Sequence, residues 1–131
     1  MVRPRREIVL ILARDLASQL STPMFIVDTE GTLIYFNEPA EAIIGRTWAE
    51  AGELSAEEWG TMFRQRTLEG EPLPTKELPL VIALTEHRAS HRSLRITGLD
   101  GVERTISNTA IPLMPHPGEI VGAVSVFWDT D

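Results

Sequence analysis

Strand-like runs stand in two groups, one near each end of the chain, with only short helical stretches between them. The first group holds two short runs of β-forming residues separated by Asp-Thr-Glu-Gly, a hairpin signal. The second group holds three longer runs, joined by turns that contain Gly and Pro. The five runs are 24–27, 32–36, 90–97, 102–111 and 119–128. This order predicts an α+β fold in which helices cover one face of a five-stranded sheet.

Composition limits the size of the fold and the classes of partner. The 131 residues, 43% of them apolar, form one domain with a substantial core. The net charge of -7 and the scattered basic residues argue against nucleic-acid binding. The longest apolar run, six residues from Ile8 to Ala13, is too short to span a membrane. We therefore expect a soluble cytoplasmic protein.

The N-terminal segment Glu7–Leu20 is expected to form an amphipathic helix, because an apolar residue recurs at helical spacing. The stripe consists of Val9, Leu12, Leu16 and Leu20. It either packs on its own domain or also forms a dimer seam, and the two roles are compatible.

Capping signals predict further helices in the middle of the chain. Asn37 is expected to cap a short helix that Gly45 ends. Ser55-Ala-Glu-Glu58 has the pattern of a capping box. Thr75 is expected to cap a third helix that runs to about His87.

Several motifs follow one another in a specific order. The strand pair ends in Asn37 before the short helix, GEPLPTKELPLVIAL occupies residues 70–84, an Asp-Gly turn precedes Arg104, and Pro112-Leu113 and Gly122 follow. Asp129-Thr130 resembles the start of an Asp-x-Thr element, with Asp131 where Thr would stand. Together these features resemble a PAS domain over residues 21–131, with residues 1–20 as a flanking amphipathic helix. The resemblance implies a five-stranded antiparallel sheet curved around a pocket that short helices close.

Asn108 is the strongest candidate for a ligand contact. In the run 102–111 one face is polar and the other carries Ile106, Asn108 and Ala110. A buried amide without a partner costs about 1–3 kcal/mol, so Asn108 must bond to a ligand, to water or to another group within the core. By the resemblance, the ligand pocket would be lined by Asn108, Ser125, Phe127, Ile106, Ala110, Phe25, Val27, Trp48, Met62, Leu80, Leu84, Leu94 and Ile96. Plain core packing is the alternative for the apolar members of this set.

The resemblance also implies interaction surfaces. The last strand carries apolar residues on both faces, which is typical of a strand covered on each side. We expect a homodimer with an interface formed by Val9, Leu12, Leu16, Val124, Val126 and Trp128. A downstream or separate output domain is expected as a further partner, whereas nucleic acid and membrane are not.

Cofactor and catalytic chemistry have little support in the residues. Haem-binding PAS domains often use a histidine on the helix before the third strand, so the resemblance makes His87 a candidate haem ligand. At a helix end, however, His87 serves more simply as a favourable cation, so haem is not expected. The absence of cysteine is taken to exclude flavin–cysteinyl photochemistry. If the pocket binds a ligand, the expected occupant is a small apolar or weakly polar molecule. No catalytic or metal-binding motif is present, so we expect no enzyme and no metal site.

The expected function is that of a sensor in bacterial-type signal transduction. Such a module would bind a small molecule or a partner and transmit its state through dimerisation or to an output domain. The alternative is a PAS module with a collapsed pocket that serves only dimerisation and protein–protein interaction.

Overall fold

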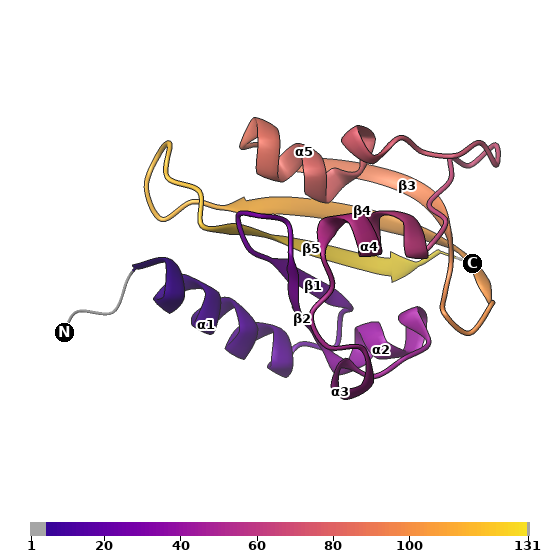
Figure 1. Cartoon of the computed structure of the whole chain (residues 1–131), viewed down its shortest axis with the longest axis horizontal. Helices are drawn as coiled ribbons and strands as arrows, with labels where there is room; N and C mark the ends of the chain where they lie inside the picture. The colour runs from indigo at the N-terminus through magenta and orange to yellow at the C-terminus, as the bar shows by residue number, and fades with distance from the viewer. Residues whose placement is uncertain (1–4, 131) are drawn as a thin grey trace.

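The computed structural model describes residues 5–130, and it contains the predicted five-stranded antiparallel sheet (Figure 1). The strand order is β2-β1-β5-β4-β3, so the first hairpin and the last three strands meet where β1 pairs with β5. The expected run boundaries hold to within three residues. The strands are β1 (Met24–Val27), β2 (Leu33–Phe36), β3 (Ser90–Thr97), β4 (Glu103–Leu113) and β5 (Gly122–Asp129).

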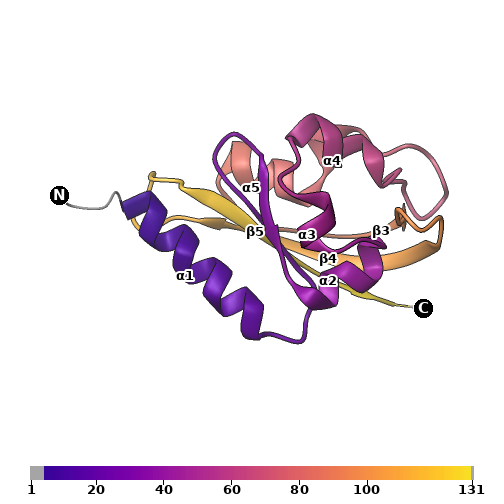
Figure 2. The ribbon, with the colours of Figure 1, turned by 60° about the horizontal axis from the view of Figure 1, so that its bottom comes forward.

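Helices cover both faces of the sheet (Figures 1 and 2). One face carries α2, α3, α4, α5 and the 3-10 helix η1 over the main core, and the other carries α1 over a smaller core. The helices are α1 (Arg5–Gln19), α2 (Glu38–Ile44), α3 (Trp48–Ala51), α4 (Ala56–Met62), η1 (Thr75–Glu77) and α5 (Pro79–Glu86). Because β1 lies between the two cores, all four of its residues are buried.

Side-chain hydrogen bonds determine where the short helices begin. The predicted capping box of Ser55 and Glu58 is present at α4, and Thr47 and Glu50 form a second one at α3 that was not predicted. The expectation for Thr75 was wrong, because it begins only the 3-10 turn and α5 starts separately at Pro79. Proline at a first helical position lacks the N–H that would need a cap, which explains this start.

The helix α1 is present, but its predicted stripe does not face the sheet. Leu10, Ala13 and Ala17 pack over β1 and β5, and Ala17 is fully buried. Leu12 and Leu16, in contrast, are 62% and 56% exposed. The small alanines allow the helix to approach the sheet closely, so close packing decided the orientation. Residues 1–4, within the expected flanking segment, and Asp131 lie outside the described residues.

Asn37 connects α1, β1 and α2 through one fully buried amide. Its Oδ1 accepts hydrogen bonds from the backbone N–H groups of Met24 (3.0 Å) and Ala40 (3.2 Å). Its Nδ2 donates to the carbonyl oxygens of Ala17 and Thr22, both at 2.9 Å. Asn37 therefore caps α2, as predicted, and also holds the end of α1 and the start of β1.

Replacing Asn37 by Ala should lower the free energy of unfolding by about 3 kcal/mol or more, because several buried backbone groups lose their partner at about 1–3 kcal/mol each. Urea unfolding followed by fluorescence measures this loss. Thr47→Ala removes an exposed helix cap and serves as the control, with an expected cost of about 1 kcal/mol. Equal losses for the two variants would show that Asn37 acts only as a cap.

The capping box of α4 should make stability depend on pH. The pKa of Glu58 is lowered below its ordinary value of 4.5 by two hydrogen bonds to Ser55. The bond to the Ser55 backbone has the larger effect, and the bond to its side chain has the smaller one. A lowered pKa stabilises the fold above the ordinary value, and this contribution disappears as the pH falls through the lowered pKa. The difference in stability between the wild type and Glu58→Gln should therefore shrink with acidification. Denaturant titrations from neutral to acid pH test this, with Glu57→Gln as the control for charge, and a difference independent of pH would contradict it.

Candidate functional site

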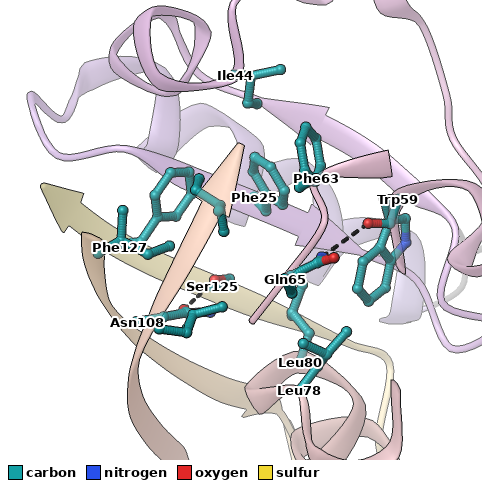
Figure 3. A pocket seen from close by; sticks show the side chains of 13 residues that line it. Phe25, Ile44, Trp59, Phe63, Gln65, Leu78, Leu80, Asn108, Ser125 and Phe127 are labelled. Carbon is teal, nitrogen blue, oxygen red and sulfur yellow. Dashed lines mark hydrogen bonds between the residues drawn. The ribbon is translucent and has the colours of Figure 1, made fainter. Parts of the chain in front are cut away.

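A cavity of about 50 Å³ lies between the inner face of the sheet and the helices (Figure 3). Strands β1, β3, β4 and β5 form one side of it, and α2, α4, α5 and the chain between α4 and η1 form the other. Among the described residues, no charged side chain takes part in its wall. The lining residues are Phe25, Ile44, Trp59, Phe63, Gln65, Leu78, Leu80, Leu94, Ile96, Ile106, Asn108, Ser125 and Phe127.

Aromatic rings occupy much of the concave side of the sheet. Phe25 packs edge-on against Phe127, with ring centroids 5.0 Å apart, and lies 6.0 Å from Phe63 and 5.9 Å from Phe36. Such contacts add stability beyond the burial of area. The space that remains is far below the ~300–1,000 Å³ of usual ligand pockets.

Asn108 has a partner inside the protein. The hydroxyl of Ser125, which is almost fully buried, donates to Asn108 Oδ1 at 2.6 Å. This hydrogen bond provides a partner within the core, which is one of the possibilities that the sequence left open. The amide N–H groups of Asn108 are not used in this contact, so they can still donate on the sheet side of the cavity.

Gln65 forms the polar part of the opposite wall. Its Nε2 donates to the carbonyl of Trp59 (3.1 Å), and Nε1 of Trp59 donates to the carbonyl of Gly31 (2.7 Å). Oε1 of Gln65 is buried and has no hydrogen-bond partner among the described residues. Arg66 Nε is in the same situation. Buried polar atoms without partners are rare, so Oε1 is available to accept a hydrogen bond from a water molecule or a ligand.

Eight of the predicted pocket residues lie in the cavity wall. They are Phe25, Leu80, Leu94, Ile96, Ile106, Asn108, Ser125 and Phe127. Seven of these eight belong to strands, where the alternation of side chains assigns a face directly. The placement is geometric, and whether these residues contact a ligand stays a prediction.

Five predicted residues do not line the cavity, and the structure corrects their placement. Trp48 packs edge-on against Tyr35 and Phe36, with centroid distances of 5.9 and 5.3 Å, because the unpredicted helix α3 begins at this residue. The other four are Val27, Met62, Leu84 and Ala110. All five belong to the main core or pack against it, which is the alternative that the sequence left open.

Five wall residues were not predicted, namely Ile44, Trp59, Phe63, Gln65 and Leu78. The capping box at Ser55 places Trp59 on α4, which was a usable signal for a buried aromatic residue. Gln65 lies between elements, where no periodicity assigns a direction to its side chain.

Other candidate centres receive no support from their positions. His87 is exposed, follows the last residue of α5 in a left-handed conformation, and is outside the cavity wall. Across residues 5–130, no three His, Asp or Glu side chains are grouped so that they could hold a metal ion. In the same part of the chain, none of the helices has the length and apolar character needed to cross a membrane.

Comparison with known proteins finds similarity at the level of structure. No family model matches the sequence, and no curated protein matches it. The PAS domain of a protein from Colwellia psychrerythraea aligns with a TM-score of 0.65 and 17% identity, over 92% of this chain and 96% of that one. The PAS domain of nitrogen regulation protein NR(II) from Vibrio parahaemolyticus gives 0.62 and 14%, over 90% and 97%. The Rhodobacter sphaeroides LOV protein gives 0.73 and 15%, over 94% and 68%.

The LOV structures correct the expectation about cofactors. The absence of cysteine was taken to exclude flavin–cysteinyl photochemistry, whereas several similar structures are LOV proteins, which bind flavin. A missing cysteine removes a thiol from the sequence but does not decide whether a flavin is bound. The expectation was therefore wrong, and the cofactor of this chain is unknown.

Both the topology and the alignments lead to one assignment of fold. The antiparallel order β2-β1-β5-β4-β3 is matched over nearly the whole chain by PAS domains, a class that includes sensory domains of signalling proteins. The sequence identities of 14–17% support the fold and not a shared ligand. This chain has the PAS fold.

Proposed function

We propose that this chain is a signal-sensing module in which occupation of the cavity changes the position of α1. The observation that carries the proposal is that β1 and β5 each separate the cavity from this helix. Phe25 and Ser125 line the cavity, while Met24, Ile26 and Val124 on the same two strands pack beneath α1. A displacement of either strand by a ligand would therefore reach the opposite face directly, since packed cores shift between discrete arrangements.

Asn37 supplies a second connection between the two faces. It bonds to Met24, the residue before Phe25, and to the carbonyl of Ala17 in the last turn of α1. A shift of β1 and a shift of α1 are thus linked by one rigid amide. The resulting change in α1 would pass to a partner subunit or to an output domain in a longer signalling protein.

A second role, dimerisation through α1, is favoured by its exposed apolar residues. Ile8, Leu12 and Leu16 of α1 lie on the surface, as does Leu20, which follows the helix, and Trp128 on the same side of the sheet is 44% exposed. Exposed apolar residues on one side of a helix commonly mark an interface. Val9 and Val126 are half-buried, and Val124 is covered by α1 of the same chain, so Val124 cannot contact a partner while α1 stays in place.

A larger side chain in the cavity should imitate an occupant. Ile106→Phe adds volume to the wall, so we expect hydrogen exchange of the α1 amides to become several-fold faster as the strands beneath it shift. The substitution should cost about 1–3 kcal/mol by overpacking, which a thermal melt will reveal. Val102→Phe places the same ring at an exposed position and serves as the control. Unchanged exchange in a folded Ile106→Phe protein would contradict the proposed coupling.

Charges on α1 should prevent dimerisation without unfolding the domain. The double variant Leu12→Glu/Leu16→Glu is expected to be monomeric, because it places two carboxylates where the apolar contact would form. Sedimentation equilibrium measures the association, and Ser18→Glu/Gln19→Glu is the control on exposed polar positions of the same helix. Deleting the helix is unsuitable because it covers Met24 and Ile26. A monomeric wild type would exclude this role and leave the sensing proposal intact.

A further inference from the structure

The orientation of the Gln65 amide is determined by its neighbour. Its Nε2 lies 3.1 Å from the carbonyl oxygen of Trp59, and exchanging the two amide atoms would place oxygen against oxygen. Oε1 is therefore the atom left without a partner among the described residues. It can only accept a hydrogen bond, so an occupant that satisfies it must donate one.

The remaining wall limits the charge and polarity of an occupant. Gln65 comes from the segment after α4, whereas Asn108 and Ser125 belong to strands β4 and β5 on the sheet side (Figure 3). The other ten lining residues are apolar, and none of the thirteen is charged. A charged occupant would lose its hydration without gaining a counter-ion, which disfavours cations and anions alike.

The size of the cavity limits the number of atoms. A cavity of roughly 150 Å³ accepts benzene, and each water needs about 10–15 Å³ of the space open to its centre. The cavity of about 50 Å³ is therefore suited to a molecule of a few non-hydrogen atoms or to a small group of waters.

We propose that the cavity selects small neutral hydrogen-bond donors, of the class of short alcohols and primary amides, through Oε1 of Gln65. The O–H or N–H group of the ligand donates to Oε1, and its carbon atoms pack against the aromatic and aliphatic wall. A molecule without a donor would leave Oε1 unpaired and binds more weakly. This inference rests on the proposed function, because it identifies the chemistry of the occupant that the sensor detects.

Two isomeric probes test the proposal on the intact chain. 1-Propanol and ethyl methyl ether have the same atoms, but only the alcohol can donate a hydrogen bond. Titrations followed by amide chemical shifts in NMR should show saturable shifts at the wall residues, with the alcohol bound about tenfold more tightly. In Gln65→Met, which keeps the side-chain length and removes the acceptor, this preference should disappear. Gln19→Met on the exposed face of α1 is the control.

Each other outcome overturns the proposal. Equal affinities for the two probes, or a preference that survives in Gln65→Met, would show that Oε1 does not select the ligand. Shifts that grow without saturation, or a cavity that retains only water at every probe concentration, would show that no such ligand binds. If Gln65→Met fails to fold, Gln65→Leu, which also removes the acceptor, takes its place in the same comparison.

The two experiments distinguish a failure of the proposed ligand class from a failure of the proposed sensing function. Faster α1 exchange in Ile106→Phe together with equal binding of alcohol and ether would reject the ligand class and leave the sensor in place. Selective alcohol binding with no change in α1 exchange would reject the transmission and leave the ligand class in place.

Discussion

The buried amide of Asn37 is the interaction on which the arrangement of the two cores depends. Its four hydrogen bonds join the end of α1, the following loop, the start of β1 and the start of α2. Leaving these backbone groups unpaired inside the protein would be costly, so the amide determines where α1 ends and where β1 begins. The register of β1 against β5 then places Phe25 opposite Ser125. Cavity and helix are thereby held on opposite faces of the same two strands.

The cavity resembles a packed core, and only three of its lining residues, Gln65, Asn108 and Ser125, are polar. Four phenylalanines, Phe25, Phe36, Phe63 and Phe127, fill the concave side, and Asn108 is satisfied by Ser125. This filling brings the structure close to the collapsed-pocket alternative. Gln65 adds to this packed interior a buried acceptor oxygen that has no partner among the described residues.

The site could be predicted on its sheet side and not on its helix side. Strand alternation assigned Ile106, Asn108, Ser125 and Phe127 to the face that lines the cavity, since every second residue of a strand shares a face. For the short helices, no comparable rule predicts which side chains face the cavity. Each has at most eight residues, so its direction depends on caps and on what it packs against, which is why Trp48 was placed in the wall and Trp59 was not.

The sequence by itself determined the five strands, their antiparallel pairing by short turns, the cap at Asn37 and the capping box at Ser55, because these depend on local propensity and periodicity. Only the tertiary structure decided which side of α1 is buried and which residues close the cavity. Val9, Leu12 and Leu16 are more apolar than Ala13 and Ala17, yet the alanines face the sheet because they permit close packing there. The unpaired oxygen of Gln65 likewise depends on contacts between segments far apart in the chain, and a local sequence pattern does not predict such contacts.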